Sequence, residues 1–284
     1  MLREALGIVA CVGLLTLGCS GGAGSSEQGS TGTGGSPEQS STSTGGGGAS
    51  PVAVVCGGPG RSFGEGSGGA GGHVPVAMGC DASAPGTTTI SCVESFTPGD
   101  GSGFGDDHFP EIIYGPPYGA GTHGGSTDVL SLGTDGEIVV GFGGNGVVDG
   151  EGADFIVFEN AFLTGKNPFK ELAQISVSDD GTTWTAFPCK HDALPYDGCA
   201  GWHAVCSNPH NDVSPYDPLA AGGDVFDLAT IGVKSARFIK IVDQHNTGWS
   251  GGTTGFDLDA VAVIHAQALP QSNARKASSD SRSW

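Results

Sequence analysis

The stretch Glu137–Asn160, EIVVGFGGNGVVDGEGADFIVFEN, predicts two strands and a loop between them. The flanking runs, Glu137–Phe142 and Asp154–Glu159, are rich in β-branched and aromatic side chains, which suit a pleated, half-buried sheet. The glycine-rich loop between the runs holds three carboxylates: Asp149, Glu151 and Asp154. Carboxylates this close together repel one another unless a cation lies between them, so the loop is a candidate calcium site.

The chain after this stretch predicts more short strands with turns between them. Leu172–Ser178 alternates apolar and polar residues, Asp179–Gly181 favours a hairpin turn, and Thr182–Phe187 reads as the partner strand. Ser235–Val242 and Phe256–Ile264 follow the same pattern. Because no window shows helical periodicity, the sequence favours an all-β fold, an antiparallel β-sandwich.

The N-terminus has the features of an export signal. The apolar run Ala5–Leu17 is shorter than the roughly 20 residues that span a bilayer, and it fits the core of a signal peptide. Thr16–Cys19 resembles the bacterial lipobox, in which the cysteine becomes the lipidated first residue of the mature protein. We therefore expect a lipoprotein signal peptide at 1–18 and lipidation at Cys19, with an ordinary secretory signal as the alternative.

The composition divides the remainder into four segments. These are a disordered Gly/Ser-rich tether at 19–50, an irregular Cys-containing segment at 51–92 packed on the sandwich, the sandwich itself at 93–266, and a disordered tail at 267–284. The formal net charge of −19 repels phosphate backbones, so a nucleic-acid partner is not expected. The expected location is the cell envelope or cell surface, with the lipid anchor as the contact with the membrane.

Six cysteines follow the anchor, an even number that predicts disulfides in an oxidising compartment. They are Cys56, Cys80, Cys92, Cys189, Cys199 and Cys206. Three precede residue 100 and three lie between 189 and 206, so complete pairing requires at least one bridge between the two clusters. The alternative is a zinc site built from the second cluster and the histidines near it.

Several segments resemble known families. ISVSDDGTTWTAF and SARFIKIVD resemble the middle strands of discoidin (F5/8 type C) and related galactose-binding-like jelly rolls. GADFIVFENAF, AGGDVFDLA and GFDLDAVAVIHA resemble a group of bacterial cell-surface lipoproteins. The jelly-roll resemblance implies carbohydrate binding by loops at one end of the sandwich, and a structural calcium held partly by an acidic residue near the last strand. Asp257 and Asp259 occupy that position here, whereas the long insertion at 188–221 departs from the discoidin pattern.

Calcium needs six to eight oxygen ligands, several of them carboxylates. The candidates are Asp149, Glu151, Asp154, Glu159, Asp257 and Asp259. In an extended strand Asp257 and Asp259 point to the same face, about 7 Å apart. The alternative is that Asp149 and Asp154 are turn and strand-edge residues that accept hydrogen bonds from the local backbone.

The aromatic residues favour binding. Trp202 and Trp249 are predicted in loops, where an exposed indole can stack on a sugar ring, and His245 lies close to Trp249 in the sequence. The alternative is that both tryptophans pack the loops against the sandwich.

Catalysis is not expected. Gly248–Gly252 matches the G-x-S-x-G elbow without the strand and helix that this motif requires. The sequence thus predicts a binding or adhesion protein that carries calcium, with carbohydrate as the expected ligand. The alternatives are a structural surface module with protein partners, or a glycoside hydrolase that uses two carboxylates.

Overall fold

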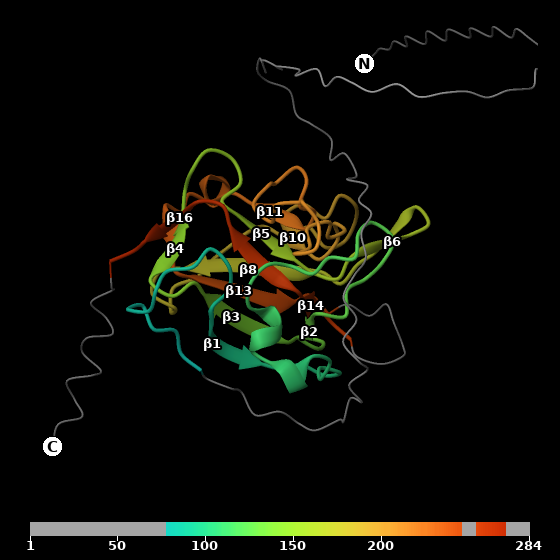
Figure 1. Cartoon of the computed structure of the whole chain (residues 1–284), viewed down its shortest axis with the longest axis horizontal. Helices are drawn as coiled ribbons and strands as arrows, with labels where there is room; N and C mark the ends of the chain where they lie inside the picture. The colour runs from blue at the N-terminus through green and yellow to red at the C-terminus, as the bar shows by residue number, and fades with distance from the viewer. Residues whose placement is uncertain (1–77, 246–253, 271–284) are drawn as a thin grey trace, which may run out of the picture. The chain divides into compact units, whose positions relative to one another are not determined.

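The computed structural model describes residues 78–245 and 254–270 (Figure 1). These residues all belong to one compact unit, Ser50–Trp284. The predictions for the signal peptide, the tether, Cys19, Cys56 and Trp249 lie outside the described residues, as does most of the predicted tail. Within the described ranges, no helix has the length and hydropathy that crossing a membrane requires.

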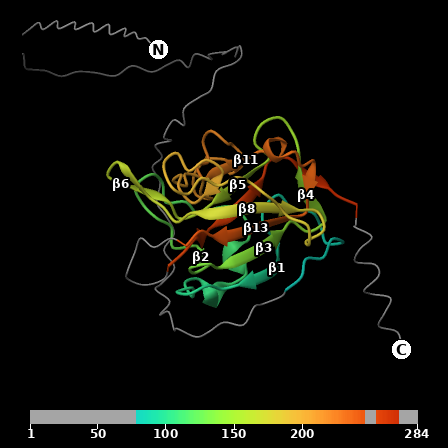
Figure 2. The ribbon, with the colours of Figure 1, turned by 180° about the vertical axis from the view of Figure 1, so that it is seen from behind.

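The largest sheet has six antiparallel strands, and Figure 2 shows four of them, β1, β3, β13 and β8, in their order across the sheet. The strands in sheet order are β1 (Cys92–Thr97), β3 (Glu137–Gly141), β13 (Phe238–Asp243), β8 (Ala173–Ser178) and β10 (Cys199–Ala200), with β9 (Thr185–Ala186) also paired to β8.

Smaller antiparallel sheets complete the fold. Two have three strands: β11 (Asp224–Phe226), β5 (Phe155–Phe158) and β15 (Ala260–Val263); and β12 (Ser235–Ala236), β4 (Asn145–Val148) and β16 (Ala266–Ala268). Two are pairs: β14 (Asp257–Leu258) with β2 (Leu130–Ser131), and β6 (Phe162–Thr164) with β7 (Asn167–Phe169). The helical turns are short 3-10 segments, η1 (Asp106–His108), η2 (Glu111–Ile113) and η3 (Leu228–Ile231), and the described residues contain no α-helix. The fold is all-β and antiparallel, consistent with the expected sandwich.

Strand β5 is buried on both faces, which explains its unbroken apolar sequence. Phe155 and Val157 belong to the main core, while Ile156 and Phe158 belong to a second cluster. Val205 and Ala221, both within the 188–221 insertion, lie in that second cluster. The insertion therefore covers the face of the β5 sheet that would otherwise be exposed.

The glycine-rich loop predicted between Phe142 and Asp154 contains a strand, β4, so the interpretation of this whole segment as loop was wrong. Strand β4 pairs with β12 and β16. Gly146 is needed there because a Cβ would lie 2.5 Å from the Ala236 carbonyl oxygen. Glycine in this strand allows close strand approach, whereas the sequence pattern suggested a flexible turn.

Two predicted strands are shorter or interrupted. The expected strand Thr182–Phe187 is reduced to Thr185–Ala186, because the Asp180 carboxylate accepts hydrogen bonds from the amides of Thr182 and Thr183, both at 2.7 Å, and holds them in a turn. The expected strand Phe256–Ile264 divides at Asp259 into β14, which pairs with β2, and β15, which pairs with β5.

Disulfides join Cys80 to Cys92 and Cys189 to Cys199. Cys206 is disulfide-bonded too. All three cysteines of the 189–206 cluster are therefore oxidised, which removes the thiolates that the zinc alternative needs.

Candidate metal centre

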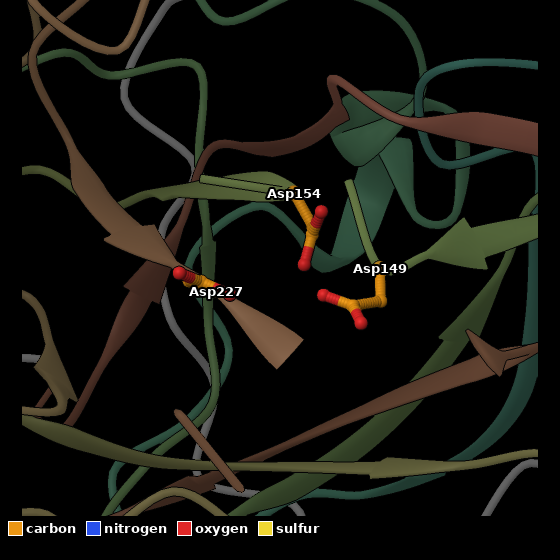
Figure 3. A group of neighbouring side chains, drawn as sticks. All are labelled: Asp149, Asp154 and Asp227. Atoms are coloured by element: carbon orange, nitrogen blue, oxygen red, sulfur yellow. The ribbon is translucent and has the colours of Figure 1, made fainter. Parts of the chain in front are cut away.

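The structure places two of the three predicted loop carboxylates together. Asp149 and Asp154 lie with Asp227 in a group whose carboxylate oxygens are within 4.8 Å of one another (Figure 3). Glu151 is exposed and does not join this group.

Hydrogen bonds within the protein engage both carboxylate oxygens of Asp154. It is fully buried, and its Oδ1 accepts the Gly150 amide at 2.8 Å and pairs with His265 Nδ1 at 2.7 Å. Its Oδ2 accepts the Leu228 amide at 2.7 Å. With both oxygens engaged, Asp154 ties the end of the glycine-rich segment to η3 and to the last strands.

The other two members also have partners. Asp149 pairs with Lys234 Nζ at 2.5 Å, a contact that raises the pKa of Lys234. Asp227 caps η3 by accepting the Ala229 amide at 2.8 Å. The three carboxylates thus have their own donors and cation, which favours the alternative that Asp149 and Asp154 are turn and strand-edge residues.

A second acidic group lies deeper in the molecule. Glu159, Glu171 and Asp257 offer carboxylate oxygens within 4.8 Å of one another. Glu159 directly follows β5, Glu171 lies just before β8, and Asp257 begins β14. Three strand ends that are distant in the sequence therefore bring their acidic residues to one point. We call these three residues the acidic centre.

Glu159 distinguishes this centre from the first group. It is 1% exposed, and neither carboxylate oxygen has a hydrogen-bond partner among the described residues. The nearby Asn160 backbone amide lowers the pKa of Glu159 but does not outweigh the effect of burial. An unpaired buried carboxylate is costly, because removal from water disfavours the charged form and nothing replaces the lost hydration.

The pKa values of the centre reflect this cost. Burial raises the pKa of Glu159 well above its ordinary value, and the charges of Asp257 and Glu171 raise it further. Burial and the charges of Asp257 and Asp243 raise the pKa of Glu171 to about 8. Asp257 is partly exposed as a residue, but its carboxyl group is enclosed, and burial raises its pKa to about 6 despite hydrogen bonds from Ser131 and Asn160. Such a group must either keep protons or hold a cation.

Two further carboxylates lie near the centre, and both have donors. Asp224 Oδ2 accepts the amides of Gly201 at 2.7 Å and Trp202 at 3.2 Å, and its Oδ1 pairs with His203 Nδ1 at 2.6 Å.

Asp243, the second of them, accepts the amides of Asp135 at 3.1 Å, His245 at 2.8 Å and Phe256 at 2.9 Å. Asp224 and Asp243 thus hold the surrounding backbone in place and add negative potential to the acidic centre.

The spacing of the carboxylate oxygens in the acidic centre is short enough for a single cation to contact all three residues. Calcium–oxygen distances are about 2.4 Å, so two oxygens on one ion lie at most about 4.8 Å apart. The oxygens of the centre meet this limit of 4.8 Å. Asn160 Oδ1 is another oxygen without a hydrogen-bond partner among the described residues. Gly125 packs against it so closely that a Cβ would lie 2.5 Å away. The oxygen-only donor set is the kind that hard cations prefer.

The structure brings together only some of the calcium ligands predicted from the sequence. Glu159 and Asp257 are in the acidic centre, whereas Asp259 is not, because both of its oxygens accept the Tyr118 amide at 3.0 Å. Burial raises the pKa of Asp259 well above its ordinary value. The interruption of the strand at Asp259 removes the alternation that was expected to place it beside Asp257. Glu171 was missed, since a single glutamate before an alternating strand carries no local metal signal.

The predicted ligand-binding residues do not converge within the described residues. His245 is exposed and its Nδ1 pairs with Asp135 at 3.2 Å. Trp202 is half-buried; its ring centroid lies 3.7 Å from that of His203 and 5.7 Å from that of Tyr196, which it meets edge-on. Lys170 Nζ lies 4.7 Å from the Tyr196 ring centroid. Only Trp202 is therefore part of an aromatic surface.

No family model and no curated protein matches the chain. Among solved structures, the C-terminal domain of a chitobiase from Bacteroides fragilis aligns with 48% of this chain and 65% of that domain, at 17% identity and a TM-score of 0.26. The match thus spans slightly less than two thirds of that domain, and at this TM-score the likeness carries no functional argument.

Proposed function

We propose that this protein is an exported, lipid-anchored binding protein of the cell envelope or cell surface, and that its sandwich holds calcium at the acidic centre. The observation that carries the calcium proposal is Glu159, a buried carboxylate without a hydrogen-bond partner among the described residues, next to two further carboxylates. A divalent cation would replace the missing partners and offset the repulsion within the centre. The proposed connectivity of the sandwich is a jelly roll, as the sequence resemblance implies.

Calcium suits the centre better than other common cations. The three residues offer oxygen alone, whereas zinc and copper sites are rich in imidazole or thiolate. Magnesium demands near-ideal octahedral geometry and usually keeps several waters, while calcium accepts irregular sets of carboxylates and amide oxygens. Glu159 is 1% exposed and Glu171 is 8% exposed, so the centre is enclosed and suits an ion that sheds its water readily.

Calorimetric titration of the purified full-length protein with calcium tests this proposal. We expect one calcium to bind per chain, with magnesium at least tenfold weaker, a difference of about 1.4 kcal/mol. Glu171→Gln keeps the shape of the side chain but removes one charged ligand, so calcium should bind it at least tenfold more weakly. Glu151→Gln is the matched control, because this residue is exposed and outside the centre. Equal calcium affinity in wild type and Glu171→Gln would contradict the proposal.

Carbohydrate is the proposed ligand, through the aromatic surface at Trp202. The indole meets the Tyr196 ring edge-on and is half-buried, so part of it is open to a partner. Exposed aromatic rings present an apolar face on which sugar rings can stack. A hydrolase has less support, because the carboxylates with raised pKa values, Glu159 and Glu171, are enclosed and a glycosidic bond could not reach them.

A glycan array tests the ligand class. We expect binding to a subset of glycans and its loss, by tenfold or more in affinity, on Trp202→Ala. Trp184→Ala is the control, because Trp184 packs against a separate cluster with Cys80 and Phe238 and lies under Lys240. An array without binding, together with capture of a defined envelope protein by the same sample, would replace carbohydrate by a protein partner.

A further inference from the structure

Four residues contact one another on chain segments that adjoin the acidic centre. Trp202 contacts Tyr196 and His203, and Lys170 lies over the Tyr196 ring. We call Lys170, Tyr196, Trp202 and His203 the aromatic ledge. Lys170 is the sequence neighbour of Glu171, a member of the acidic centre, so the two sites share one backbone segment.

The backbone at Gly201 is fixed by both sites. The Glu171 amide donates to the Gly201 carbonyl at 3.2 Å, and a Cβ on Gly201 would lie only 1.9 Å from the Glu171 carbonyl oxygen. Gly201 has a φ of +94°, which favours glycine. The two peptide segments are thus in direct contact, and a displacement of Glu171 must displace Gly201.

Asp224 carries the connection from Gly201 to the ledge. One of its oxygens accepts the amides of Gly201 and Trp202, and the other pairs with the His203 ring at 2.6 Å. Asp224 is 4% exposed, so these bonds are sheltered from water. The Trp202 backbone and the His203 ring are therefore held by a carboxylate whose charge also acts on Glu159.

We infer that calcium at the acidic centre fixes the aromatic ledge, so that carbohydrate binding by Trp202 depends on calcium. This inference rests on the proposed function. Without the ion, no ligand bond holds the Glu171 side chain, so the segment that carries Glu171 and its backbone contact with Gly201 is less restrained. The bound ion restrains Glu171 and, through that contact, orders the backbone that carries Trp202.

Amide hydrogen exchange on the full-length protein, with calcium or with chelator, tests this coupling. We expect the Gly201 and Trp202 amides to exchange about tenfold more slowly with calcium, because ordering of the segment suppresses its local opening. The Leu228 amide, which Asp154 holds, serves as an internal reference and should change much less. In Glu171→Gln the calcium effect on Gly201 and Trp202 should disappear.

A second variant separates ion binding from coupling. Asp224→Asn keeps the size of the side chain but removes the charge that pairs with His203 and weakens the bonds to the two amides. It should still bind calcium in the calorimeter, yet lose most of the protection at Trp202. If calcium binds wild type calorimetrically without slowing exchange at Gly201 or Trp202, the coupling is wrong and the metal site stands. If calcium does not bind at all, both the proposed function and this inference fail.

Discussion

In chelator, the protein is expected to lose stability as the pH rises from about 5 to above 8, while in saturating calcium this loss should be absent. Burial raises the pKa of Asp257 to about 6 and that of Glu171 to about 8. A carboxyl whose pKa is raised by folding stabilises the native state below its unfolded pKa, and this contribution disappears as the pH passes the native value. Calcium requires the ionised form, so the ion takes the place of the protons.

The size of the calcium effect on stability depends on the binding free energy of the ion and on the competition from protons. Calcium at a hundredfold excess over its dissociation constant contributes about 2.7 kcal/mol. For a domain of this size about 1 kcal/mol corresponds to roughly 2–4 °C in melting temperature, so calcium should raise the melting temperature by about 5–10 °C at pH 8. At pH 5 the difference should shrink, because protons compete with the ion for the same oxygens.

Circular dichroism can follow thermal unfolding from pH 5 to above pH 8, in calcium and in chelator. These melting curves measure how much stability calcium contributes at each pH. Asp154→Asn is the matched control, because it removes a buried carboxylate whose partners are all within the protein. It should lower the melting temperature equally in calcium and in chelator. Parallel pH profiles in calcium and chelator for the wild type would show that the raised pKa values are unrelated to an ion.

The strands could be predicted from the sequence better than the site. The apolar runs at β3, β5, β8 and β13 were recognised because burial on a sheet requires β-branched and aromatic residues in unbroken or alternating patterns. Strand β4 was missed because Gly146 is there for close packing, and glycine in a sequence suggests a turn. Local composition shows which residues a sheet requires but not how closely two strands approach.

The site could be predicted only in part, because hydrogen-bond partners come from distant segments. Asp154 looked like a metal ligand, yet the Leu228 amide satisfies it across 74 positions of sequence. Asp259 is satisfied by Tyr118 across 141 positions. Glu159, also a candidate ligand, differs from these two because the structure leaves its carboxylate without a partner among the described residues. Sequence shows where carboxylates are, but not which of them already have donors.

Glu159→Gln is therefore expected to have opposite effects in the two conditions. In chelator at pH 8, where Asp257 is ionised and Glu171 is about half ionised, it removes a buried acid that must either keep its proton or add a further negative charge. Its amide group can also donate to Glu171 or Asp257. We expect stabilisation on the order of 2 kcal/mol, or roughly 4–8 °C, from relief of like-charge repulsion and of the burial of an unpaired charge. In calcium the variant lacks a charged ligand, so it should bind the ion at least tenfold more weakly and melt below the wild type.

The decisive feature is a reversal of the two melting temperatures: the variant melts above the wild type in chelator and below it in calcium. Melting curves of both proteins in both conditions measure this reversal. A residue that only supports the fold, such as Asp154, lowers stability in both conditions when its charge is removed, because its buried donors lose their partner. A residue whose role is to bind an ion destabilises the fold when that ion is absent, since its charge is buried and unpaired. If Glu159→Gln is less stable than wild type in chelator as well as in calcium, then Glu159 supports the fold by itself and the centre does not need a cation.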